Sequence, residues 1–96
     1  MAGIRTEVME HRDELITAAA RHRARNVRLF GSVATGRDDP GSDVDFLVDF
    51  EPGATLLDLA DLQDEFEAIL GRQVDVLSSR ALKERDDDIR REAVAL

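Results

Sequence analysis

The sequence contains no cysteine, no tryptophan and no tyrosine, and only two prolines among its 96 residues. Without cysteine there can be no disulfide framework, no zinc ribbon and no thiol nucleophile, so a bound metal must be held by oxygen ligands or by the two histidines. No apolar run approaches the roughly 20 residues of a transmembrane helix, and the N-terminus lacks the apolar segment of a signal peptide. The sequence therefore predicts a cytoplasmic protein that does not bind a membrane.

Positive charge is also scarce, because 13 Lys and Arg stand against 21 Asp and Glu, for a formal net charge of −8. Nucleic-acid binding needs a concentrated basic surface, so we expect no direct contact with nucleic acid. One local exception is the stretch RHRARNVR at residues 21–28. Its simplest role is to place cations near the C-terminus of a helix, and the alternative is a patch that meets an acidic partner or a nucleotide.

What the chain does contain is typical of one small globular domain. Hydrophobic residues make up 43% and charged residues 35% of the sequence. A chain of this length buries only about two-thirds of the surface that its unfolded form exposes, which leaves room for one core. We therefore predict a single domain over residues 1–96.

Hydrophobic periodicity predicts alternating helices and strands, an α/β fold. Apolar residues at helical spacing predict a first helix from residue 4 to about 24, with Asn26 near its end, and a last helix from about Ala81 to the C-terminus. A middle helix is predicted between a capping box at Thr55 and Asp58 and a terminating Gly71. The strands and the short helical turn that complete the order αβ(α)βαβα are expected at 27–30, 33–35, 43–50 and 74–77.

The most informative stretch is GSVATGRDDPGSDVDF, residues 31–46. Its residues 39–42, DPGS, predict a turn, because proline presets φ at the second position and glycine at the third position tolerates the positive φ of a type II turn. The chain then enters a strand in which alternation places Asp43 and Asp45 on one face, about 7 Å apart. Asp75 joins them if the strand at 74–77 pairs beside this one.

These three carboxylates predict a metal site. Like charges gathered at 4 Å repel by roughly 4 kcal/mol per pair at an effective dielectric near 20, so a cation or protons must offset the repulsion. Mg²⁺ prefers oxygen ligands and is commonly held by carboxylates together with substrate phosphates, and two such ions suit phosphoryl transfer. The ligand order of an EF-hand calcium loop is absent. Three further aspartates are interpreted as ordinary surface residues: Asp38, Asp39 and Asp49.

A phosphate site is predicted beside the metal site. Gly31 and Ser32 directly follow a strand, where glycine lets the backbone approach a phosphate and the serine hydroxyl is a donor. If residues 33–35 form a helical turn, its free N–H groups also suit an anion. Gly36 is expected to end that turn.

The combined pattern resembles the nucleotidyltransferase superfamily that includes the DNA polymerase β palm, and in particular its minimal nucleotidyltransferases. Gly31-Ser32, then ten residues, then Asp43-Val44-Asp45 match the family signature without a gap. The resemblance covers essentially the whole chain. It implies a nucleotidyltransferase palm with a small three-stranded mixed sheet flanked by helices.

The resemblance also implies the role of each site residue. Asp43 and Asp45 would bind both Mg²⁺ ions, and Asp75 would complete the shell of one ion and help to deprotonate the acceptor hydroxyl. Gly31 and Ser32 would hold the β and γ phosphates of ATP. Relatives often carry basic residues where this sequence has Val33 and Thr35, so phosphate contacts would depend on Arg37 or on the arginines of 21–28.

Many small members of this family are antitoxins encoded beside a HEPN ribonuclease toxin. The resemblance implies transfer of AMP from ATP to a tyrosine hydroxyl of that toxin, which blocks the ribonuclease. Because the chain has no tyrosine, the acceptor must come from another molecule. The alternatives are a noncatalytic antitoxin that masks its toxin in a complex, and nucleotidyl transfer to a small molecule. The apolar stripe of the last helix leaves open a homo-oligomer or a hetero-oligomer with the toxin.

Overall fold

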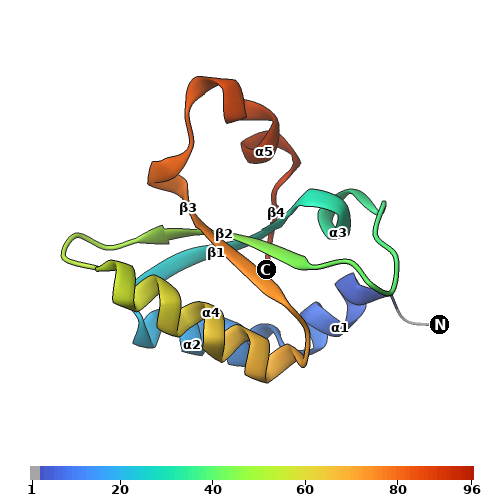
Figure 1. Cartoon of the computed structure of the whole chain (residues 1–96), viewed down its shortest axis with the longest axis horizontal. Helices are drawn as coiled ribbons and strands as arrows, with labels where there is room; N and C mark the ends of the chain where they lie inside the picture. Colours follow the sequence, from blue (N-terminus) through green and yellow to red (C-terminus); the bar gives the residue numbers. More distant parts are fainter. Residues whose placement is uncertain (1–2) are drawn as a thin grey trace.

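A computed structural model describes residues 3–96 as a four-stranded mixed sheet with helices on both sides (Figure 1). The strand order is β3-β2-β1-β4, in which β2 runs parallel to β3 and β1 runs antiparallel to both β2 and β4. The elements in chain order are α1 (Ile4–Glu10), α2 (Arg12–Arg21), β1 (Ala24–Phe30), α3 (Gly31–Thr35), β2 (Val44–Phe50), α4 (Leu56–Leu70), β3 (Val74–Ser78), α5 (Asp87–Glu92) and β4 (Val94–Ala95). The α/β class is confirmed, with one strand more than the three expected.

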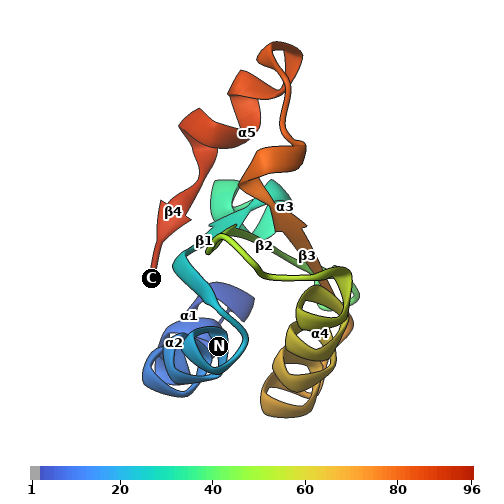
Figure 2. The ribbon, with the colours of Figure 1, turned by 90° about the vertical axis from the view of Figure 1, so that its left-hand side faces the viewer.

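The main core lies between the sheet and the helices α2 and α4, which cover the same face side by side (Figure 2). Alternation along β2 sends Phe46 to this face, where its ring meets Phe66 of α4 edge to face with centroids 4.8 Å apart. On the opposite face Leu47 is also fully buried. That face is covered by α3 and by the segment that follows β3, so both faces of β2 are shielded from water (Figure 1).

Local signals at α4 are confirmed. Thr55 and Asp58 form the capping box, with the Thr55 N–H donating to Asp58 Oδ2 at 2.9 Å and the Asp58 N–H donating to Thr55 Oγ1 at 3.4 Å. Gly71 ends the helix in the left-handed conformation, φ 64°. Two side chains of α4 also protect the outer edge of β3, because Gln63 and Glu67 accept hydrogen bonds from the N–H groups of Val76 and Val74.

The prediction of one long first helix is wrong. The helix breaks at His11, whose φ of −101° and ψ of 14° are not helical, and α2 ends at Arg21. Strand β1 then begins at Ala24, three residues earlier than expected. Asn26 therefore lies inside β1, with φ 52°, at the point where the pairing with β2 shifts register. Asparagine tolerates this conformation better than most residues, so it marks a bulge and not a helix end.

The predicted last helix from Ala81 is also wrong. Two 3₁₀ turns, Ser79–Ala81 and Glu84–Asp86, lead into the six-residue α5 and then into β4. This charged stretch has few apolar side chains that could hold a long helix on the sheet. The outer edge of β1, by contrast, has backbone groups that need partners. Val94 pairs opposite Leu29, and the N–H of Leu96 donates to the carbonyl of Val27 at 3.0 Å.

Across residues 3–96, none of the helices combines the length and the apolar character needed to cross a membrane.

Candidate active site

The candidate site begins where β1 passes into α3. Phe30, the last residue of β1, pairs opposite Asp45 of β2, and Gly31 follows it with φ 73°. A Cβ atom at Gly31 would lie less than 3.0 Å from Asp45 Oδ2. Only glycine therefore allows this backbone conformation and this approach of the Asp45 carboxylate at once.

Two predicted metal ligands are neighbours across parallel strands. Asp45 of β2 and Asp75 of β3 are in register, and Asp43 precedes Asp45 by two residues, so alternation directs it to the same face. Asp45 is half-buried, whereas Asp43 and Asp75 are exposed. The structure thus brings together the three aspartates that the sequence singles out.

Electrostatics support this grouping. The pKa of Asp45 is raised to about 6, first by burial, then by the negative charges of Asp75 and Asp43 and by a hydrogen bond with Asp75. The ordinary pKa of an aspartate is 3.8. Asp45 is therefore an anion that the fold holds at a cost, beside two further anions, and a bound cation would remove that cost.

The donor chemistry of this cluster fits Mg²⁺, which takes carboxylate oxygens. Within residues 3–96, however, no three acidic or histidine side chains already converge on one point as a complete ligand set. Asp43 and Asp75 are exposed and free to reorient, so the cluster is suited to an ion that also takes ligands from a substrate phosphate.

The expected helical turn forms but begins two residues earlier, because α3 includes Gly31 and Ser32, and Gly36 ends it with φ 75°. The Thr35 hydroxyl turns back and donates to the carbonyl of Gly31 at 3.1 Å, while Arg37 Nε donates to Thr35 Oγ1 at 3.0 Å. Val33 is buried in the core. The two positions where basic side chains are often found in relatives therefore serve packing and a local hydrogen bond.

Arg37, the remaining predicted nucleotide contact, lies on the surface. Besides Thr35, its guanidinium approaches Glu92 of α5, with Nη2 and Oε2 4.0 Å apart. This contact joins residues 55 positions apart in sequence, so no local pattern could have indicated it. Ser32 is half-buried beside Gly31 at the start of α3.

The turn between α3 and β2 is present, but its predicted type is wrong. The Ser42 N–H donates to the Asp39 carbonyl at 3.0 Å, as in a β-turn, yet the φ of Gly41 is not positive. The Asp39 side chain accepts the Gly41 N–H at 2.8 Å and so closes the turn from within. Arg72 holds this loop by donating to the Pro40 carbonyl at 3.1 Å.

Asp49 lies four residues after Asp45 on the same face of β2 and has a structural role. It accepts hydrogen bonds from Asn26 at 2.7 Å and from Arg28 at 2.6 Å. Burial raises its pKa, but the hydrogen bonds from Ser79 and Asn26 and the contact with Arg28 outweigh burial and bring the pKa below 3.8. Two aspartates on one strand face thus have opposite pKa shifts, because burial and neighbouring carboxylates raise the pKa of Asp45, whereas hydrogen bonds from Ser79 and Asn26 and the contact with Arg28 lower that of Asp49.

Comparison with known proteins decides the family of the chain. The family model described as "Nucleotidyltransferase domain" matches residues 8–95. The chain belongs to this family. A solved structure of a minimal nucleotidyltransferase is 43% identical to it, with a TM-score of 0.86 and coverage of 96% of this chain and 95% of that chain.

Two curated relatives share the nucleotidyltransferase domain with the chain. Protein adenylyltransferase MntA of Thermococcus cleftensis is 40% identical over 73 residues, 76% of this chain and 71% of the relative. A protein of Methanocaldococcus jannaschii named protein adenylyltransferase MJ0435 is 36% identical over 75 residues, 78% of this chain and 81% of the relative. A toxin-antitoxin crystal structure with AMP-PNP matches in fold, with a TM-score of 0.73 at 17% identity, covering 86% of this chain and 69% of that chain.

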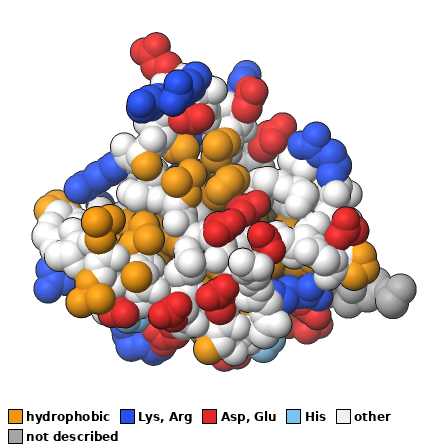
Figure 3. Space-filling model, viewed as in Figure 1, with side chains coloured by type: hydrophobic (Ala, Val, Ile, Leu, Met, Phe, Trp, Pro, Cys, Tyr) orange, Lys and Arg blue, Asp and Glu red, His pale blue; other side chains and the backbone are white. Residues whose placement is uncertain are grey.

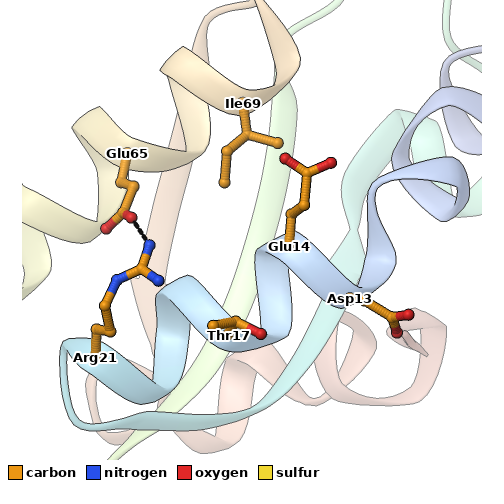
Figure 4. Close-up of a pocket in the computed structure, with 6 residues that line it drawn as sticks. All are labelled: Asp13, Glu14, Thr17, Arg21, Glu65 and Ile69. Atoms are coloured by element: carbon orange, nitrogen blue, oxygen red, sulfur yellow. Dashed lines mark hydrogen bonds and ion pairs between the residues drawn. The ribbon is translucent and has the colours of Figure 1, made fainter.

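Three of the four arginines of 21–28 have contacts elsewhere in this nucleotidyltransferase domain. Arg21 pairs with Glu65 of α4, Arg28 pairs with Asp49, and Arg23 reaches the carbonyl of Gly53. Arg21 and Glu65 stand at one end of an open groove of about 410 Å³ between α2 and α4 (Figure 4). Apart from Arg21, none of the predicted site residues lines this groove, which lies on the other side of the sheet from α3 (Figure 1).

The raised pKa of Asp45 predicts a pH dependence. Because the pKa rises from 3.8 to about 6 on folding, the native state holds the Asp45 proton more tightly, and this carboxyl destabilises the protein as pH increases through that interval. In metal-free protein we expect the Asp45 carboxyl to titrate near pH 6 by carbon NMR. The Asp49 carboxyl, whose pKa is lowered, provides the internal control. An Asp45 that titrates at its ordinary value would contradict the electrostatic description of the site.

Proposed function

We propose that this nucleotidyltransferase is a cytoplasmic, Mg²⁺-dependent protein adenylyltransferase that acts as an antitoxin. It transfers AMP from ATP to a tyrosine hydroxyl of a HEPN-type ribonuclease toxin encoded nearby, with release of pyrophosphate, and so neutralises the toxin. The observation that carries the proposal is the half-buried Asp45, held against the backbone of Gly31 and beside Asp75. The names of the two curated relatives support protein adenylyl transfer, and the toxin-antitoxin neighbour supports an antitoxin role.

The proposed roles follow from the position of each residue. Asp43, Asp45 and Asp75 would hold Mg²⁺, which supplies positive charge that offsets the charge of the phosphates. Gly31 would let the triphosphate approach the backbone, and the Ser32 hydroxyl would donate to it. Arg37 would contribute a positive charge to the phosphates. It would first leave Glu92, and this exposed ion pair adds little stability.

Proton transfer would fall to Asp75. It is exposed at the open edge of the cluster, so an incoming hydroxyl can reach it, and it is in register with Asp45. The acceptor must be supplied by the partner, because the chain contains no tyrosine. The remaining contribution of the protein is to orient the reactants and to concentrate negative ligands around the cation.

The proposal is tested by mixing the protein with ATP, Mg²⁺ and the neighbouring toxin. We expect intact mass spectrometry to show addition of AMP to the toxin. Reactions without Mg²⁺ and reactions with GTP in place of ATP serve as controls. Peptide mapping then identifies the modified residue. An unmodified toxin that is nevertheless neutralised by the wild-type protein would contradict the catalytic part of the proposal.

One observation favours the second candidate, a noncatalytic antitoxin. Near Gly31 and Ser32 the side chains of Val33 and Thr35 are engaged in the core and in a local hydrogen bond, and Arg37 is paired with Glu92. This leaves little positive charge for a triphosphate. If neutralisation is by complex formation alone, folded Asp43→Ala and Asp45→Ala variants still protect cells from the toxin, and loss of protection rejects this candidate.

A further inference from the structure

Helix α4 begins with two leucines that nothing covers. Leu56 is 85% exposed and Leu57 is 69% exposed, although both are long aliphatic side chains. In residues 3–96 the one other exposed large hydrophobic side chain is Ile16, at 38%. The capping box fixes Leu56 and Leu57 as the first helical residues, so their exposure is set by the rigid start of a helix.

Leu56, the first of the two leucines, borders an apolar groove. Leu56 lines a hollow of about 220 Å³ together with Phe50, Ala54 and Leu59, and Ser78 and Arg80 form its other wall. We call this groove with Leu57 the α4 surface. Figure 3 shows hydrophobic side chains gathered over the start of α4, on the left of that view. Exposed apolar area concentrated in this way, rather than scattered singly, is typical of an interaction site.

The α4 surface lies at a useful distance from the catalytic aspartates. Strands β2 and β3 run parallel toward the groove, with Phe50 five residues after Asp45 and Ser78 three residues after Asp75. At about 3.3 Å per residue the separation along the strands is roughly 10–17 Å, and alternation places Phe50 and Ser78 on the α4 face and the aspartates on the opposite face. A folded protein docked on the groove must therefore extend past the ends of β2 and β3 to present a side chain to Asp75.

Charge selects among possible occupants. Three acidic residues lie within five sequence positions of one of the exposed leucines, namely Glu51, Asp58 and Asp61, whereas the groove lining contains one cation, Arg80, and the chain carries a net charge of −8. In a symmetric dimer through the α4 surface, this acidic rim would face its own copy at close range, which is unfavourable. A basic protein that offers an apolar side chain would match both the groove and its rim.

We propose that the α4 surface is the docking site for the acceptor protein, which inserts an apolar side chain flanked by basic residues into the groove. The identity of the acceptor as the neighbouring toxin rests on the proposed function. Docking here would fix the distance between the partner and the aspartates and so select which hydroxyl reaches Asp75.

The test measures binding of the neighbouring toxin to the purified full chain without ATP, by isothermal titration calorimetry. For Leu56→Gln/Leu57→Gln we expect Kd to rise by at least about tenfold, because truncation of central apolar contacts dominates interface energetics. Ile16→Gln is the matched control, an exposed aliphatic residue on α2, and should change Kd less than about twofold. Both variants should keep the wild-type melting temperature, since the replaced side chains are exposed. Added salt should weaken wild-type binding.

Three outcomes would overturn the proposal. The first is an unchanged Kd for Leu56→Gln/Leu57→Gln, and the second is a wild-type chain that does not bind the toxin. The third is a wild-type dimer in sedimentation that this variant converts to monomer, which would assign the surface to a second copy. Failure of the chemistry is distinguishable, because toxin that binds wild type but receives no AMP affects only the proposed function. Where AMP is transferred, the variant should raise KM for the toxin and leave kcat unchanged.

Discussion

Replacement of Asp45 by asparagine is expected to reduce AMP transfer by roughly 10³-fold or more and, in metal-free protein above pH 6, to increase stability. The asparagine side chain has nearly the same shape as aspartate but no charge, so it cannot help to hold a cation. The substitution also removes the repulsion from Asp43 and Asp75 that, with burial, raises the Asp45 pKa to about 6. Initial rates of AMP incorporation and urea unfolding at pH 7.5 and pH 4 measure the two effects.

Asp49→Asn is the matched control on the same strand face. Asp49 is held by Asn26 and Arg28, and the loss of its charge should cost roughly 1 kcal/mol of unfolding free energy while AMP transfer by the folded protein persists. The two variants are thus expected to change stability in opposite directions. If Asp45→Asn instead destabilised the protein at pH 7.5 as Asp49→Asn does, the strained anionic site would not exist.

Gly31→Ala is expected to have the second large effect. Alanine at φ 73° costs about 1–2 kcal/mol, and its Cβ would meet Asp45 Oδ2 at less than 3.0 Å. Either the start of α3 or the Asp45 carboxylate must move, so AMP transfer should fall by about 10²-fold even in protein that remains folded. Chemical denaturation measures the loss of stability, and initial rates at saturating ATP measure the loss of AMP transfer.

Gly36→Ala is the control that separates the cost of a positive φ in alanine from the contact between a Cβ atom and Asp45. Gly36 has φ 75°, nearly the value of Gly31, but a Cβ there meets nothing within 4 Å. We therefore expect a loss of about 1 kcal/mol in stability and nearly full activity. Equal losses of activity in the two variants would show that Asp45 does not depend on its contact with Gly31.

Features that depend on neighbours in sequence could be predicted. Alternation along 43–50 places Asp43 and Asp45 on one face, and Thr55, Asp58 and Gly71 define the ends of α4. Each of these follows from period-2 or helix-end chemistry within a few residues. The adjacency of Asp75 needed one further assumption, that β3 lies beside β2, and the register Asp45 to Asp75 confirms it.

Features that depend on residues distant in sequence could not be predicted from the sequence. The segment after Ala81 has helical spacing of apolar residues, but the unsatisfied edge of β1 recruits Val94 as a strand. Arg37 lies near Glu92 only because α5 returns to α3. In each case a hydrogen bond or charge from elsewhere in the fold outweighs a weak local preference.

The sequence by itself determined the family, the face of β2 that carries the carboxylates and the glycine that follows β1, because spacing and residue type suffice for these. The tertiary structure decided that Asp45 becomes a half-buried anion with a raised pKa whereas Asp49 becomes a paired one. It also decided that Leu56 and Leu57 stay uncovered while Leu62 and Phe66 of the same helix are fully buried. Burial and charge environment are properties of the assembled chain, since they arise from residues brought together by pairing of strands and packing of helices.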